Sequence, residues 1–130
     1  MVKKRKKRKR RYISGIYEST KAGICSYRSS WELRYMEYLD ANEEVINWSY
    51  EKLIIEYVSN KKTNKIRKYY PDFQIEYADG KKFVVEIKQS RKLKQMNVIK
   101  KIKAAIKWCT DHDMTYKILT EIELKDIGLL

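Results

Sequence analysis

Residue types that build several common kinds of site are scarce in this sequence. Its 130 residues include two cysteines, one histidine and one proline. Cys25 and Cys109 form no CxxC pair and His112 stands alone, so the composition excludes a cysteine–histidine zinc site. No serine lies near that histidine in the sequence, which leaves a nucleophilic triad without support. With so few cysteines, we expect a reduced, cytosolic compartment.

Long apolar runs are also absent. No stretch is long enough to cross a bilayer, and the basic start is not followed by the apolar run of a signal peptide, so no membrane partner is expected. Hydrophobic residues still make up 43% of the chain, enough for one core. We expect residues 13–130 to form a single domain.

Positive charge is abundant and unevenly distributed. The net charge is +13, and without a run of nine basic residues near the start the count is 21 basic against 17 acidic. Such a run repels itself until it meets a polyanion, so residues 1–12 are expected to form a flexible basic arm. Nucleic acid is the favoured polyanion, since binding phosphates releases counterions; a solubility tail, a nuclear address and a membrane-surface anchor are alternatives. The DNA contacts expected in the arm are Lys3, Lys4, Arg5, Lys6, Lys7, Arg8, Lys9, Arg10 and Arg11.

The first half of the remaining chain predicts a helix followed by strands. Residues 13–27 indicate a loop or extended segment that docks onto the body. An apolar stripe over residues 28–44 predicts a helix capped by Ser29 or Ser30 and ended at Asn42. Residues 45–59 predict one or two strands, and the polar turn 60–65 makes a hairpin with the residues that follow.

The second half predicts a strand pair, a long helix and one further strand. Strands 72–77 and 83–89 are joined by an Asp-Gly turn, which indicates a second hairpin. A helix over 91–112, with Val98, Ile102, Ala105, Ile106 and Cys109 on its apolar face, leads to a strand over 115–121. This crossover predicts a parallel neighbour. The fold class is therefore α/β, with a central mixed sheet flanked by helices.

Charged residues at the end of the most apolar strand indicate a site. Glu86 and Lys88 lie two residues apart and so face the same side of the strand. The Asp-Gly turn would bring Asp72, at the start of the partner strand, beside them. Two such carboxylates repel unless a cation lies between them, which predicts Mg²⁺ held by Asp72, Glu86 and the backbone carbonyl of Ile87. A solvated strand end with an ordinary salt bridge between Lys88 and Asp72 is the alternative.

The spacing from Pro71-Asp72 to Glu86-Ile87-Lys88 resembles the motif of the PD-(D/E)XK nuclease superfamily. With "YRSSWE", "VINWSYE" and "AAIKWC", residues 27–125 resemble the TnsA-type endonuclease domain, and more closely the phage head-completion nucleases built on it. The resemblance implies a restriction-endonuclease-like fold and metal-dependent cleavage of DNA by Glu32, Asp72, Glu86 and Lys88. Glu32 would bind a second metal or act through water, although the helix dipole also favours an acid there.

The resemblance implies DNA as the main partner, with phage head or portal proteins as further ones. It also implies the cytoplasm of a bacterial host cell, or else the virion, as the location of the protein. Lysines of the second helix region are candidate DNA contacts, although a solvated helix face is an equal alternative. The lysines are Lys92, Lys94, Lys100 and Lys101. A structural virion protein, a DNA-binding protein with little turnover and a junction resolvase remain alternatives to a free nuclease.

Overall fold

The computed structural model describes residues 14–130; the predicted basic arm, residues 1–12, lies outside them. The fold is α/β, as expected from the sequence. No helix within the described range is long and apolar enough to span a membrane. In chain order the elements are β1 (Gly15–Ser19), β2 (Gly23–Tyr27), α1 (Ser30–Ala41), β3 (Val45–Tyr50), β4 (Ile55–Asn60), β5 (Lys65–Tyr69), β6 (Phe73–Tyr77), β7 (Lys82–Ile87), the 3₁₀ turn η1 (Ser90–Lys92), α2 (Met96–Asp111), β8 (Thr115–Leu119) and α3 (Glu121–Asp126).

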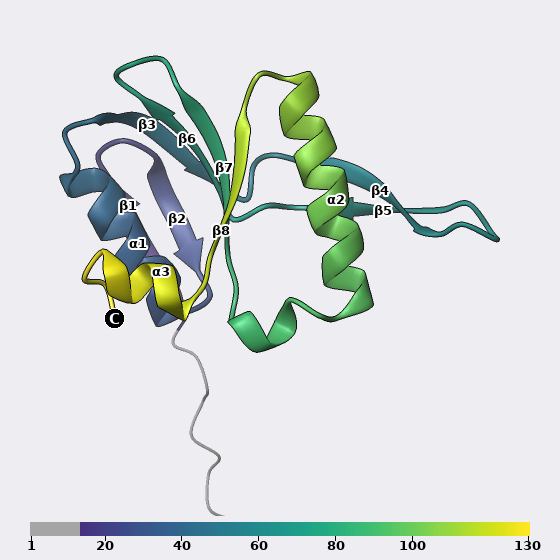
Figure 1. Ribbon diagram of the computed structural model, residues 1–130. Helices are drawn as coiled ribbons and strands as arrows, with labels where there is room; N and C mark the ends of the chain where they lie inside the picture. The colour runs from purple at the N-terminus through teal and green to yellow at the C-terminus, as the bar shows by residue number, and fades with distance from the viewer. Residues whose placement is uncertain (1–13) are drawn as a thin grey trace, which may run out of the picture.

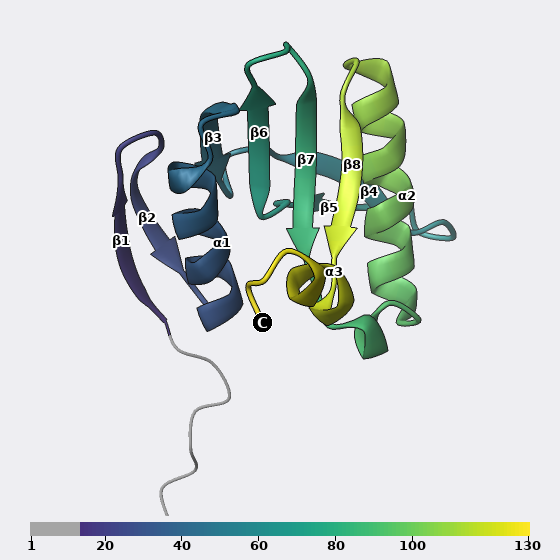
Figure 2. The ribbon, with the colours of Figure 1, turned by 60° about the vertical axis from the view of Figure 1, so that its left-hand side comes forward.

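A four-stranded mixed sheet with the order β3-β6-β7-β8 forms the centre of the protein (Figure 2). β6 pairs antiparallel with both β3 and β7, whereas β8 returns from α2 and pairs parallel with β7, which confirms the predicted crossover. The turn between β6 and β7 contains Gly80 at φ 87°, a conformation that glycine adopts without steric cost. This turn sets the register that places Phe73 opposite Val85.

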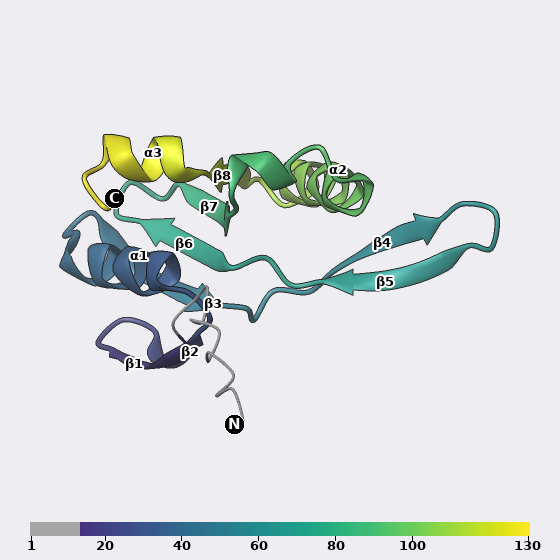
Figure 3. The same ribbon diagram turned by 90° about the horizontal axis from the view of Figure 1, so that it is seen from below.

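Helices cover the sheet from two sides (Figure 3). On one side Met36 and Leu39 of α1, both fully buried, pack in the main core with Phe73 of β6. On the other side α2 packs against β4 and β8, and its Ala105 lies in a second core cluster with Tyr69. This is the flanked mixed sheet of a restriction-endonuclease-like fold.

The segment 13–27, expected to be a loop or an extended piece, contains a regular antiparallel hairpin, β1–β2. Hydrogen bonds to α1 dock it on the body: the hydroxyls of Tyr17 and Ser19 both donate to Asp40. Cys25 adds an apolar contact, since it is buried in the main core. The hairpin thus extends the hydrogen-bonded structure beyond what the sequence predicts.

The second helix begins later than predicted. Residues 90–92 form a 3₁₀ turn, and α2 starts only at Met96. Its N-cap, Gln95, makes no capping side-chain hydrogen bond, so the sequence contains no signal at the true start. The predicted apolar face is right for Val98, Ala105 and Cys109, which are buried, but wrong for Ile106, which is half exposed.

Candidate active site

The end of β7 brings charged side chains to the rim of the sheet. Val84 and Val85 are buried as expected for a central strand, and Glu86 is buried with them. Lys88 follows the strand, and its N–H donates to the Leu119 carbonyl at 3.1 Å, which keeps it in line with β8. Glu86 and Lys88 both line a cleft of about 680 Å³.

Asp72 lies at the same rim, directly before β6. Its Oδ2 accepts a hydrogen bond from the Ile87 N–H at 2.8 Å. The pairing of Phe73 with Val85 explains this contact, because the next residues outward, 72 and 86–87, must then meet. Asp72 also lines the cleft, so the structure brings it to the segment 86–88, as the hairpin pattern predicts.

Glu32 reaches the cleft from the first turn of α1. Ser29 caps this helix by accepting the Glu32 N–H at 3.1 Å. The Glu32 carboxylate accepts hydrogen bonds from the Arg28 N–H at 2.7 Å and the Tyr50 hydroxyl at 3.0 Å. Such bonds would stabilise an acid at this helix position in any protein. The Glu32 side chain nevertheless faces the cleft and lies beside Asp72.

Glu51 is a residue of the cleft that the sequence reasoning missed. It follows β3 with a left-handed backbone at φ 51°, which is uncommon for a residue with a Cβ. Its N–H donates to the Asp72 carbonyl at 2.9 Å. Glu32, Glu51 and Asp72 each offer a carboxylate oxygen, and the three oxygens lie within 4.8 Å of one another. Its position directly after β3 hints at a strand-end acid, but nothing local in the sequence places it beside Asp72.

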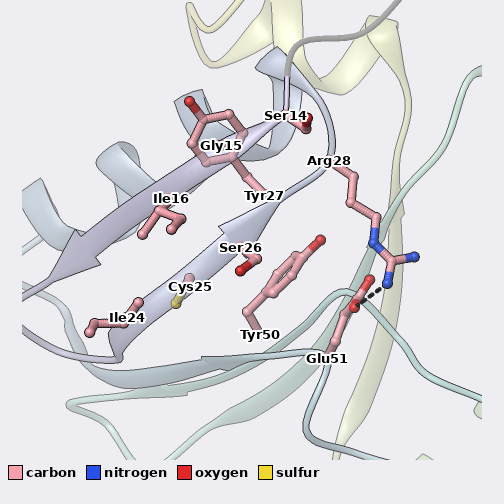
Figure 4. A pocket seen from close by; sticks show the side chains of 10 residues that line it. All are labelled: Ser14, Gly15, Ile16, Ile24, Cys25, Ser26, Tyr27, Arg28, Tyr50 and Glu51. Carbon is pink, nitrogen blue, oxygen red and sulfur yellow. Dashed lines mark ion pairs between the residues drawn. The ribbon is translucent and has the colours of Figure 1, made fainter.

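Arg28 borders this group of three acids. Its guanidinium lies 3.1 Å from the Glu51 carboxylate, and Figure 4 shows the pair beside Tyr50. The pair lies at a second pocket of about 480 Å³, lined by β2 and the end of β3. Because the Arg28 side chain is 73% exposed, the ion pair adds little to stability. It does place a positive charge where acids crowd together.

Glu86 lines the same cleft but does not belong to the group of three acids. It accepts a hydrogen bond from the Tyr69 hydroxyl, which in turn lies 2.9 Å from the Tyr116 hydroxyl. Tyr69 is buried beneath α2, so it holds Glu86 from the side of the sheet opposite α1. The group of three acids on the α1 side and Glu86 on the α2 side therefore meet at one rim of the sheet.

Burial and mutual repulsion disfavour the charged forms of these acids. Burial, followed by the charges of Glu86 and Glu32, raises the pKa of Asp72 well above its ordinary value, and the Ile87 N–H and Lys88 only partly offset this. Burial also raises the pKa of Glu32 and of Glu86. Hard oxygen donors that repel one another in a buried place are the ligand set that a divalent cation stabilises. The residues present therefore fit such an ion.

The lysines predicted to contact DNA have different positions. Lys92 and Lys101 line the cleft, and Lys68, which the sequence reasoning did not single out, joins them there. Lys94 is exposed and outside the residues that line this cleft. Lys100 donates to a backbone carbonyl of the β4–β5 hairpin instead. The nine basic residues at positions 3–11 lie outside the described residues.

Comparisons with known proteins identify the family of the chain. The family described as "TnsA-like endonuclease N terminal" matches residues 42–121, a range that includes Glu51, Asp72, Glu86 and Lys88 but not Glu32. The chain is also 31% identical, over 125 residues, to the head completion nuclease of Enterobacteria phage T4. That match covers 79% of this chain and 83% of the phage protein. The chain therefore belongs to the family of TnsA-like endonucleases.

Proposed function

We propose that this endonuclease is of the PD-(D/E)XK type and hydrolyses phosphodiester bonds of DNA with the help of Mg²⁺ or Mn²⁺. The observation that carries the proposal is the meeting of Glu32, Glu51, Asp72 and Glu86 in one cleft that four lysines also line. Acids would hold the cation, and the lysines would hold the phosphates of the substrate.

Asp72 is the central ligand in this proposal. Glu32 and Glu51 lie within metal-binding reach of it on the α1 side. Glu86 and the backbone carbonyl of Ile87 are the further ligands on the α2 side, with Glu32 the first candidate for a second ion or for a water-mediated contact. A divalent ion in such a site supplies a nucleophilic water near neutral pH and offsets charge on a phosphoryl oxygen.

Lys88 is the proposed partner of the attacking water. It lines the cleft beside Glu86, with its backbone fixed by the bond to Leu119. From there its ammonium group would orient the water and offset the charge that develops on the phosphate. Lys92 and Lys101 would bind neighbouring phosphates. The products would carry a 5′-phosphate, as in the superfamily that the motif resembles.

A role in phage assembly is the proposed biological setting. The name of the phage T4 relative links that protein to head completion. We propose the same for this chain, with phage head or portal proteins as partners and the host cytoplasm or the virion as its place of action. Mass spectrometry of purified particles tests this: the chain should be present in heads and absent from heads of a phage that lacks its gene.

The activity itself is tested with Asp72→Asn. This variant should lose Mg²⁺-dependent cleavage of plasmid DNA by at least about 100-fold, because the central ligand loses its charge. Its DNA affinity, measured in EDTA, should remain. Asp126→Asn, a change of the same kind at the exposed end of α3, is the matched control and should cut normally. Full cleavage by the Asp72 variant would refute the assignment.

A further inference from the structure

The β4–β5 hairpin projects from the body of the protein (Figure 1; Figure 3). It forms a two-stranded sheet of its own, separate from the central sheet. Most of its residues are exposed, including every residue from 60 to 68. A long ribbon of this kind contributes little to the core, so its sequence is free to serve another purpose.

The hairpin is strongly basic. Within residues 55–69 there is a single acid, Glu56, against five exposed cations. None of these cations forms an ion pair with any residue from 14 to 130. Their positive charge therefore remains available to an anionic partner. The five residues are Lys61, Lys62, Lys65, Arg67 and Lys68.

The base of the hairpin is fixed to the body. Ile55, the first residue of β4, and Tyr69, the last residue of β5, are paired at this base and are buried in one core cluster with Ala105 of α2. Farther out, the Lys100 ammonium donates to the Ser59 carbonyl at 2.6 Å. These contacts hold the ribbon at a set angle to α2, so its charges keep a fixed direction relative to the cleft.

Strand β5 of the hairpin leads directly into the cleft. β5 ends at Tyr69, and Asp72 follows three residues later. Lys68 belongs to both places, since it is part of the hairpin and also lines the cleft. We propose that the β4–β5 hairpin binds the phosphate backbone of duplex DNA on one side of the cleaved bond, an inference that rests on the proposed function.

The length of the ribbon sets the size of this contact. A strand rises about 3.3 Å per residue, so Lys65 lies up to about 23 Å from Asp72 along the chain. With base pairs about 3.4 Å apart, this distance corresponds to roughly seven base pairs. A two-stranded ribbon also fits the major groove of B-form DNA. The hairpin would therefore reach a flank that the cleft itself does not touch.

Two matched pairs of lysines provide the test. Lys61 and Lys62 occupy the turn of the β4–β5 hairpin, whereas Lys81 and Lys82 lie at the turn between β6 and β7, at the opposite end of the sheet from Asp72. We would change each pair to glutamine. Affinity for a 40-base-pair duplex would be measured in EDTA over a range of salt concentrations, so that the result does not depend on cleavage.

The hairpin variant should bind the duplex on the order of tenfold more weakly, with a salt slope reduced by up to about 2, while the Lys81/Lys82 variant should match the wild type. Trimming one flank of the DNA by about seven base pairs should weaken the wild type but not the hairpin variant. Equal binding by both variants would overturn the inference and point to a protein partner for the exposed pair Val58 and Ile66. Loss of binding by the hairpin variant would uphold it even if Asp72→Asn cut normally.

Discussion

Asp40, which is partly buried, and Asp72, which is buried, are two acids with opposite surroundings. Asp40, on α1, accepts hydrogen bonds from the Tyr17 hydroxyl at 2.5 Å, the Ser19 hydroxyl at 2.7 Å and the Trp48 indole at 2.9 Å. The Asp72 carboxylate accepts a hydrogen bond from the Ile87 N–H and lies near the carboxylates of three other acids, Glu32, Glu51 and Glu86. Three donors thus satisfy the carboxylate of Asp40, whereas the carboxylate of Asp72 has one donor and lies among other acids.

The two pKa shifts express this difference. At Asp40 burial acts to raise the pKa, but the three hydrogen bonds outweigh it and the pKa is lowered. At Asp72 burial and neighbouring charges act in the same direction, and the pKa is raised. An acid whose donors are all supplied by the protein is structural, whereas an acid left short of positive partners indicates a site for a ligand.

The largest expected effect concerns Glu51, the acid that sequence reasoning missed. Glu51→Gln should reduce Mg²⁺-dependent cleavage by about 100-fold, because the group of three acids loses one of its charges. Plasmid-nicking rates at several Mg²⁺ concentrations would measure this. Glu43→Gln, an exposed acid beyond α1, should have no effect. Wild-type rates for the Glu51 variant would remove this residue from the site.

The structural acid should behave in the opposite way. Asp40→Asn leaves three donors to share one amide oxygen, so the free energy of unfolding should fall by about 1–3 kcal/mol. Urea titration measures this loss. At a temperature where the variant is folded, its cleavage rate should match that of the wild type. A large loss of activity in a folded variant would contradict the distinction between the two acids.

A smaller effect is expected from the pH dependence of stability. With its raised pKa, folded Asp72 keeps its proton above pH 4 while the unfolded chain has lost it, so this group destabilises the fold progressively from about pH 4 upward. In EDTA at pH 8, Asp72→Asn should therefore melt at a higher temperature than the wild type, and the difference should vanish near pH 4.

Adding Mg²⁺ should sharpen that comparison. At ten times its dissociation constant the ion stabilises the wild type by about 1.4 kcal/mol and should leave the Asp72 variant unchanged. Differential scanning fluorimetry at pH 8 with and without Mg²⁺ measures both melting temperatures. An equal response of the two proteins would show that the ion binds elsewhere.

Much of the β6–β7 region follows from local sequence. The period of two in each strand and the Asp79-Gly80 turn fix the register, and the register places Asp72 against Ile87. The helix of Glu32 is equally local, since Ser29 caps it and Asn42 ends it as predicted. These features depend on residues near one another in the chain.

The features that the sequence did not predict depend on pairing between strands that are distant in the chain, or have no local sequence signal. Glu51 joins the site because β3 pairs with β6 and Tyr50 lies opposite Phe73, a contact that no local pattern encodes. β1 and β2 expose Ile16 and Ile24, so their alternation does not show a buried face. The hydroxyl of Tyr69, at the end of β5, donates to Glu86 of β7, a contact between residues that are likewise distant in the sequence.

The four acids of the cleft come from four separate segments between Glu32 and Glu86, and β7 contributes the last of them. A nascent chain that still lacks β7 would lack Glu86 and therefore one of the four acids of the proposed active site. On the proposed function, a newly made molecule would therefore be unable to cut DNA before β7 has been synthesised and has paired with β6. Any later event that separates β6 from β7 would move Asp72 away from Glu86 and abolish the proposed active site.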